Sequence, residues 1–316
     1  MAFYSSLAQG NLDALSAATT FIVKKVPRTP TCHLLCEASN ILYRTLWRKS
    51  LDPMTSVATS ILGESQERAK LVAKGCALSN IRFWSDYSML AYADDTYAQK
   101  RIEEISCKDM SVLELVNRSR RPLILLSVHL GNYLSGFIKV LSELDLHDRE
   151  LLTFRLLEET ELERLAYRHF KSRVGTFSVA RLGNEGGLLK AVRLLKAGGI
   201  VGTFADLHRG FGPTAEVSLF GVPCDLIVGP AYMAVLTKAI VLPIALCPDD
   251  NGREQLTFKT PIDATIRPGE NKDIAIQRVM NEIARNTESF VRHNPGSWLM
   301  WPNLGAYLSK SIQVDA

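Results

Sequence analysis

The sequence has no apolar run long enough to cross a lipid bilayer. The most apolar early stretch, residues 15–23, has about half of the roughly 20 residues that a spanning helix needs, and two lysines follow it. A longer run at residues 229–247 contains Lys238 and Pro243, and a helix followed by a strand explains it better. We therefore expect a cytoplasmic protein whose membrane contact, if any, is peripheral and at the inner face.

Features of a disulfide or metal framework are also missing. The six cysteines are scattered and no secretory signal precedes them, so we expect reduced thiols. Cys32, His33 and Cys36 have the spacing of half a metal site, but no second group of Cys and His completes four ligands. No metal site is predicted, and this segment is interpreted as the start of an amphipathic helix.

The chain has little excess charge of either sign. Its formal net charge is +4, which favours an acidic partner or an anionic surface without demonstrating either. There is no long run of Lys or Arg, and aromatic residues make up only 8% of the chain. With no basic stripe and no stacking platform evident, nucleic-acid binding is not expected.

Apolar residues make up 47% of the 316 residues, which is enough to form a sizeable core. Residues 1–118 have apolar positions mostly at helical spacing and predict a helical N-terminal region packed on the core. From Pro122 onward, segments typical of strands alternate with segments typical of helices. The predicted strands are 123–128, 150–154, 177–180, 200–205, 215–219, 240–247 and 254–259, and the predicted helices are 131–142, 159–173, 185–197, 228–238 and 272–292. The pattern predicts an α/β domain over residues 119–316, with a mixed sheet flanked by helices.

Two polar residues follow buried strands of this pattern. His129 comes directly after the strand at 123–128, and Asp206 after the strand at 200–205. Carboxyl ends of parallel strands lie at one rim of a sheet, beside helix N-termini, where ligands usually bind. If the two strands are parallel neighbours, the side chains share one cleft. A core histidine and a turn or cap aspartate are the alternatives.

Several short motifs occur together in one order. They are His129-Leu-Gly-Asn-Tyr-Leu134, Thr153-Phe-Arg155, Ala180-Arg181, Phe204-Ala-Asp206 with Gly210, Ser218-Leu-Phe-Gly221 and Pro295-Gly-Ser-Trp-Leu-Met-Trp301. In order and approximate spacing they resemble the lipid A late acyltransferase family, the lauroyl and myristoyl transferases of the lysophospholipid acyltransferase superfamily. The resemblance implies a lysophospholipid acyltransferase-like fold and a donor that is an acyl-carrier-protein or CoA thioester. It implies no metal or redox cofactor, and an acyl pocket shaped by residues 220–223 and 229–234.

The resemblance breaks at one catalytic position. The family has a His-x4-Glu or His-x4-Asp dyad, in which the carboxylate orients the imidazole that takes a proton from the acceptor. His129 matches the histidine, but Leu134 stands where the carboxylate should be, and leucine cannot accept a hydrogen bond. Asn132, Ser135 and Glu185 could supply the missing partner. His129 and Asp206 are the predicted catalytic residues.

Further polar residues are predicted to bind substrate. Arg155 and Arg181 match arginines of the resembled family and suit a phosphate, such as that of a phosphopantetheine arm. Ion pairing with Glu158, Glu159 or Glu185 is the alternative. Asn132, His208 and Arg209 complete the predicted binding set. His208 could also be an ordinary exposed loop histidine.

The resulting hypothesis is an acyltransferase that moves a fatty acyl group to a hydroxyl or amine of a lipid or specialised-metabolite acceptor. Members of the resembled family usually carry an N-terminal membrane anchor, so its absence favours a soluble acceptor. Two alternatives remain. Leu134 favours a noncatalytic protein that binds lipids, acyl groups or acyl carrier protein, and water as the acceptor would make the protein a thioester hydrolase.

Overall fold

The computed structural model describes residues 55–308, apart from positions 57, 147, 156–159, 183–184 and 250. The apolar stretch at 15–23, the Cys32-His33-x2-Cys36 segment, and Glu158 and Glu159 lie outside the described residues. Among the helices that are described, none combines the length and the apolar character that crossing a bilayer requires.

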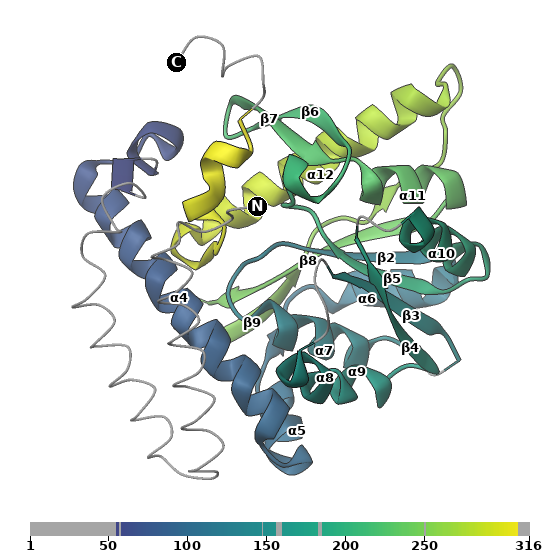
Figure 1. Cartoon of the computed structure of the whole chain (residues 1–316), viewed down its shortest axis with the longest axis horizontal. Helices are drawn as coiled ribbons and strands as arrows, with labels where there is room; N and C mark the ends of the chain where they lie inside the picture. Colours follow the sequence, from purple (N-terminus) through teal and green to yellow (C-terminus); the bar gives the residue numbers. More distant parts are fainter. Residues whose placement is uncertain are drawn as a thin grey trace.

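Eight strands of the described chain form one mixed sheet, in the order β1-β9-β8-β2-β5-β3-β4, with β10 beside β8 (Figure 1). The strands are β1 (Ser106–Cys107), β2 (Leu123–Ser127), β3 (Glu150–Arg155), β4 (Thr176–Arg181), β5 (Ile200–Phe204), β8 (Ile240–Pro248), β9 (Glu254–Phe258) and β10 (Ile262–Asp263). The run from β8 to β4 is parallel, whereas β9 and β10 pair antiparallel with β8. The predicted mixed α/β fold is confirmed.

Helices cover both faces of the sheet (Figure 1). On one face lie α5 (Asp95–Glu103), α6 (Met110–Ser119), α7 (Tyr133–Glu143), α8 (Glu161–Ala166) and α9 (Arg168–Lys171), and on the other lie α10 (Glu185–Lys196), α11 (Gly229–Thr237) and α12 (Lys272–His293). Because side chains alternate along a strand, β2 sends Leu125 to the first face and Ile124 to the second. The 27-residue helix α4 (Gln66–Tyr92) contributes to both apolar clusters, through Cys76 on one and Phe83 on the other.

The long helix α4 packs directly on a short turn near the end of the described chain, η2 (Pro295–Ser297). A Cβ atom on Gly75 would lie 2.9 Å from the Cα atom of Gly296, so glycine is needed for this approach. Nearby, Ser79 Oγ donates to the Gly296 carbonyl at 3.1 Å and Cys76 Sγ donates to the Trp298 carbonyl at 3.2 Å. These contacts fix the backbone that leads into Trp298.

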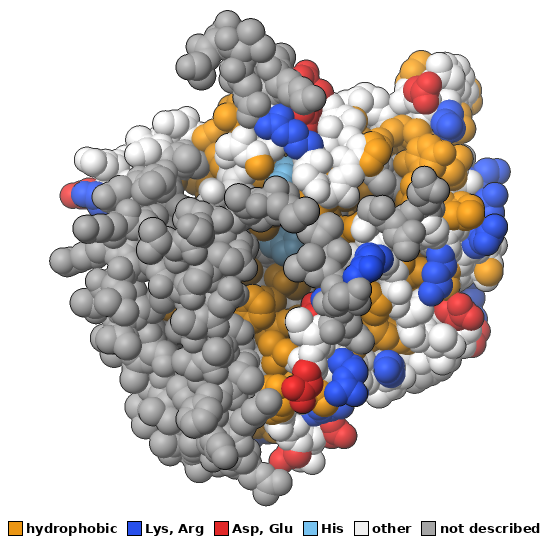
Figure 2. Space-filling view, viewed as in Figure 1, with side chains coloured by type: hydrophobic (Ala, Val, Ile, Leu, Met, Phe, Trp, Pro, Cys, Tyr) orange, Lys and Arg blue, Asp and Glu red, His pale blue; other side chains and the backbone are white. Residues whose placement is uncertain are grey.

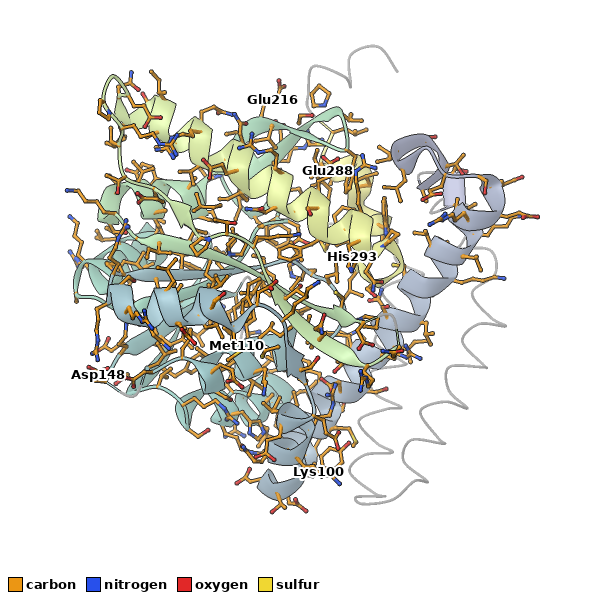
Figure 3. All side chains as sticks on the ribbon, turned by 180° about the vertical axis from the view of Figure 1, so that it is seen from behind. Lys100, Met110, Asp148, Glu216, Glu288 and His293 are labelled. Atoms are coloured by element: carbon orange, nitrogen blue, oxygen red, sulfur yellow. The ribbon has the colours of Figure 1, made fainter. Side chains whose placement is uncertain are left out.

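The structure adds the two-residue strands β1 and β10 to those predicted, and it differs from the prediction at one hairpin and one helix. The predicted strand at 215–219 is β6 (Thr214–Leu219), and an unpredicted strand, β7 (Val222–Ile227), pairs with it as a separate two-stranded hairpin. The predicted helix at 159–173 is divided into α8 and α9 because the backbone of Tyr167, with ψ of −11°, departs from regular α geometry. α12 supports the hairpin from the second face, where Glu288 accepts the Phe220 N–H at 2.7 Å (Figure 3).

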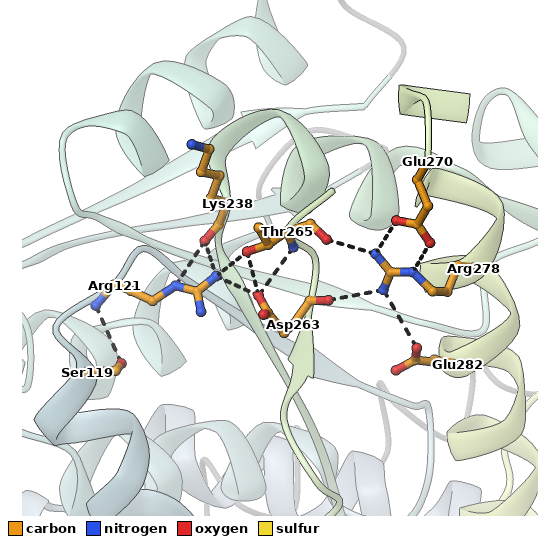
Figure 4. Close-up of polar contacts among 8 residues, drawn as sticks. All are labelled: Ser119, Arg121, Lys238, Asp263, Thr265, Glu270, Arg278 and Glu282. Atoms are coloured by element: carbon orange, nitrogen blue, oxygen red, sulfur yellow. Dashed lines mark hydrogen bonds and ion pairs between the residues drawn. The ribbon is translucent and has the colours of Figure 1, made fainter. Parts of the chain in front are cut away.

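At the amino ends of the central strands, two arginines tie the sheet to its neighbours (Figure 4). Arg121, just before β2, donates to the Lys238 carbonyl at 2.7 Å and to Asp263 Oδ1 at 2.8 Å. Arg278 of α12 donates to Glu270 at 2.7 Å and to the Asp263 carbonyl at 3.1 Å. The Arg121 hydrogen bond is the main reason that the pKa of Asp263 falls to about 2. The polar side chains at this end of the sheet make structural contacts, and the candidate site lies at the opposite rim.

Candidate active site

The two predicted catalytic residues meet at the carboxyl ends of β2 and β5. These strands are parallel neighbours, with Ser127 opposite Phe204, so the condition that the sequence left open is met. The Ala205 N–H donates to the Ser127 carbonyl at 2.7 Å and so extends the pairing by one residue. His129 and Asp206 follow at equivalent positions, and the distance between His129 Nδ1 and Asp206 Oδ1 is 2.8 Å.

The Asp206 carboxylate is fully buried and accepts three hydrogen bonds. Its Oδ1 faces His129 Nδ1, while Oδ2 accepts the His129 backbone N–H and the Trp298 indole N–H, each at 2.8 Å. The Tyr307 hydroxyl donates to the Asp206 carbonyl at 2.6 Å. Because the carboxylate accepts from every neighbour, the imidazole proton belongs on Nδ1 and the acceptor lone pair lies on Nε2.

Aromatic rings hold the imidazole in place. The His129 ring stacks on Phe204 with the ring centroids 3.9 Å apart, and Tyr133 meets it edge-on at 5.1 Å. The His129 carbonyl accepts the Leu299 N–H at 2.8 Å, which fixes the backbone as well. The His129 side chain is 18% exposed, so a substrate can reach it from one side. Histidine side chains are visible near the centre of the face in Figure 2, with hydrophobic side chains below them.

The replacements suggested for the missing dyad carboxylate contact other groups. Asn132 Nδ2 donates to Glu254, and Ser135 Oγ donates to Asp86. The side chain of Glu185 lies outside the described residues. Leu134 is buried on α7, beside the imidazole's pocket. In this chain the partner of the imidazole is instead Asp206, which follows β5.

Asn132 belongs to a polar network that anchors the start of α7. Arg101 of α5 pairs with Asp86 of α4 at 3.0 Å and also with Glu254 of β9, which accepts from Asn132. Burial and then the charge of Asp86 raise the pKa of Glu254. Burial by itself would lower the pKa of Arg101, but the two adjacent carboxylates outweigh it and raise that pKa. Asn132 was predicted to bind substrate, but the structure places its side chain in this network and not along the cavity.

A cavity of about 260 Å³ opens beside His129, between α4, α7, α8 and β3. Its walls are mainly aromatic and include Phe83, Trp84, Tyr87, Tyr133, Phe137 and Phe204. The segments at 220–223 and 229–234, which were expected to shape an acyl pocket, do not line this cavity. Phe220 packs against Trp298 and Trp301 in the core on the other face of the sheet. The cavity residues from α4 were not among the predicted site residues.

The two predicted phosphate-binding arginines lie in different surroundings. Arg155 lines the cavity with its side chain 11% exposed, and its Nη2 lies 2.7 Å from Glu163. Ion pairing, the alternative suggested by the sequence, is therefore present, but Glu163 of α8 is the partner. Arg181 is its register neighbour on β4 and is exposed.

His208 and Arg209 follow Asp206 on a loop that lies away from the cavity. His208 is buried, which corrects its interpretation as an exposed loop residue, and its Nδ1 accepts the Gly210 N–H at 3.1 Å. Burial, and then the charge of Arg209, lower the pKa of His208, while Asp206 opposes the shift. Arg209 donates to the Leu308 carbonyl at 3.2 Å and lies 3.8 Å from Asp225. Both side chains thus make structural contacts.

Two contributors to the site went unrecognised in the sequence. Trp298 lies in the terminal tryptophan motif, but the motif alone does not predict its hydrogen bond to Asp206. Tyr307 lies beyond that motif and had no signal of its own. Within residues 55–308, excluding the gaps above, no group of three or more His, Cys, Asp and Glu side chains could hold a metal ion.

Of the comparisons with known proteins, only the family model supports an inference. A search of curated protein sequences finds no match to this chain. Among solved structures, the X-ray structure of the Legionella pneumophila ATPase DotB covers 67% of this chain and 67% of its own, with 12% identity and a TM-score of 0.29, which supports no inference. The family model for bacterial lipid A biosynthesis acyltransferases matches residues 7–304, nearly the whole sequence. The chain therefore belongs to the bacterial lipid A biosynthesis acyltransferase family.

Proposed function

We propose that the protein transfers an acyl group from an acyl-carrier-protein or CoA thioester to a hydroxyl or amine of a lipid or small-molecule acceptor. Membership of an acyltransferase family supports acyl transfer in general. The observation that carries the proposal is the 2.8 Å contact between His129 Nδ1 and the buried carboxylate of Asp206. It supplies the imidazole with the acceptor that Leu134 cannot provide.

In the proposed reaction, His129 Nε2 takes the proton from the acceptor hydroxyl or amine as that group attacks the thioester carbonyl. The new C–O or C–N bond forms, the C–S bond breaks, and the imidazolium returns its proton to the departing thiolate. Asp206 keeps the ring oriented and stabilises its charged form while the proton is held. These steps move one acyl group and one proton, so they need neither a metal nor a redox cofactor.

Arg181 is the better candidate for the donor's phosphate. Its side chain is exposed at the end of β4, where a donor outside the cavity can reach it, whereas the Arg155 side chain is only 11% exposed. We expect Arg181→Ala to weaken thioester binding most at low salt, because exposed charges are screened as ionic strength rises. Equal affinity of the variant and the parent protein across salt concentrations would assign the phosphate to other residues.

The test is incubation of the purified protein with acyl-carrier-protein or CoA thioesters, alone and with alcohol and amine acceptors, followed by intact-mass detection. Acylated acceptor that disappears in His129→Ala supports the proposal, and we expect a loss of about 10²-fold or more. Release of free acid without transfer would indicate a thioester hydrolase, and retention of unchanged thioester would indicate a binding protein. Either result would overturn the proposal.

A further inference from the structure

A polar network holds the first turn of α7 from outside the cavity. Asn132 Nδ2 donates to Glu254 of β9, and Ser135 Oγ donates to Asp86 of α4. Arg101 of α5 joins the two carboxylates, since it donates to Asp86 at 3.0 Å and also to Glu254. None of these five residues lines the cavity. The network therefore ties α7 to three other elements at two points of one helical turn.

The two residues between these points of attachment line the cavity. They are Tyr133 and Leu134. The Tyr133 ring meets the His129 imidazole edge-on, with the ring centroids 5.1 Å apart, and meets the Phe204 ring in the same way at 5.0 Å. Because Tyr133 lies between the two attached residues, the network determines where its ring lies against the imidazole.

The backbone just before α7 is also closely fixed. Gly131 has a φ of +56°, and a Cβ atom there would lie 2.7 Å from the Leu246 carbonyl oxygen of β8. The Gly131 N–H donates to the Ser297 carbonyl at 2.9 Å. The loop has little room to adjust, so a change in the Asn132 contact is passed on to the first turn of α7.

Asn132 does not act as an ordinary helix cap. An asparagine in this position usually accepts an N–H group of the first turn with its Oδ1 atom, which stabilises the helix. Here the side chain makes no such bond, and the buried Oδ1 has no hydrogen-bond partner among the described residues. The amide is directed to Glu254 instead, which gives up helix stability. The position that this contact gives to α7 explains it better than stability does.

We infer that Asn132 and Glu254 are positioning residues for acyl transfer. Their hydrogen bond holds the first turn of α7 so that the Tyr133 ring stays packed against the His129 imidazole. Neither residue lines the cavity, so both act through Tyr133. The inference rests on the proposed function, because it concerns the alignment of the base in that reaction.

Exchanging the amide and the carboxylate tests this hydrogen bond. Asn132→Asp places two carboxylates together, and Glu254→Gln leaves one amide oxygen for two donors, Asn132 Nδ2 and Arg101. In the double variant the carboxylate at position 132 accepts from the amide at position 254, whose oxygen still accepts from Arg101. The double variant therefore restores both the contacts and the total charge.

Turnover with a thioester and a responsive acceptor gives the first readout. Each single variant should lower kcat by about tenfold or more and change KM for the thioester by less than about threefold, because the base is misaligned while the binding groups are untouched. The double variant should recover kcat to within about threefold of the parent protein. Glu270→Gln is the matched control, because it removes a buried carboxylate that pairs with Arg278 at the other end of the sheet. It should leave kcat unchanged even where it lowers the urea midpoint.

The second readout needs no turnover. NMR of the full-length protein with labelled histidine reports the ring protons, and His129→Ala assigns the His129 signals. The ring current of Tyr133 shifts these signals, so each single variant should move them and the double variant should return them. Ser135→Ala is a milder variant, because Asp86 keeps Arg101 as its partner, and it should move the same signals.

Three results would overturn the inference. They are a kcat that falls no further in the single variants than in Glu270→Gln, a kcat that the double variant does not recover, and His129 signals that stay unmoved in the single variants and in Ser135→Ala. A parent protein that transfers no acyl group would refute the proposed function. His129 signals that still move and return would then leave the positioning role standing.

Discussion

Replacing Asp206 with asparagine should separate catalysis from stability. The substitution keeps the size of the side chain but changes one carboxylate oxygen into an N–H₂ group. Oδ2 accepts two N–H groups, from the His129 backbone and the Trp298 indole, whereas Oδ1 faces only His129 Nδ1. The amide oxygen of asparagine should therefore occupy the Oδ2 position, which keeps two hydrogen bonds and turns Nδ2 toward the imidazole.

The consequence for the base follows from this orientation. An amide N–H pointing at Nδ1 requires that nitrogen to accept, so the imidazole proton moves to Nε2 and the ring cannot take a proton from the acceptor. An equivalent exchange of tautomer in a Ser-His-Asp triad lowers turnover by about 10⁴-fold, and we expect a loss of about 10³-fold to 10⁴-fold here. Both atoms of the asparagine amide keep a hydrogen-bond partner, and only the negative charge is lost. The free energy of unfolding should therefore fall by about 1 kcal/mol.

Turnover with a thioester and a responsive acceptor, together with urea unfolding, measures both effects. Asp225→Asn is the matched control, because Asp225 lies near Arg209 and away from the imidazole. Activity of Asp206→Asn within tenfold of the parent protein would refute the assigned role of the carboxylate. A collapse of stability would instead show that the carboxylate charge holds the fold.

Three further outcomes follow from the structure. Leu134→Glu places a charge in an apolar part of the cavity wall, next to an imidazole that already has a partner. It should lower the free energy of unfolding by about 1–3 kcal/mol without raising hydroxyl acylation. A gain in acylation with unchanged folding would contradict this. The pKa of His208 is lower in the folded protein than its unfolded value of about 6.5, so its share of stability is complete above that pH and is lost as the pH falls below it. Urea midpoints between pH 7.5 and 5.5 should therefore fall less in His208→Gln, and parallel profiles would exclude that role. Gly75→Ala, usually stabilising within a helix, should here lower the urea midpoint because its methyl group meets Gly296 at 2.9 Å, and an unchanged or higher midpoint would count against this close contact.

Much of the sheet could be predicted because its central strands are continuous apolar runs bounded by turn residues. The strands that were missed are short or carry polar residues. β1 and β10 have two residues each, and β7 contains Pro223 and Asp225, which obscure its alternation. Their pairing depends on partners elsewhere in the chain, so local sequence carries little of the information.

The candidate site, like the sheet, could be predicted only in part from the sequence. The positions of His129 and Asp206 at the ends of two strands could be predicted. Their meeting required these strands to be parallel neighbours, which the sequence left open. The hydrogen bond that replaces the dyad carboxylate depends on side-chain geometry, and so does the Arg155 pair with Glu163. The helix α4 lines the cavity by packing against elements that lie far from it in the sequence, and no local pattern reveals such a contact.

The hydrogen bonds around Asp206 also bear on when the protein can first act. Trp298 and Tyr307 lie 92 and 101 residues beyond the aspartate that they hold. Because a ribosome makes the chain from its amino end, a nascent protein that already contains β2 and β5 still lacks both donors. The hydrogen bonds that hold Asp206 beside His129 are therefore complete only after residue 307 has been made.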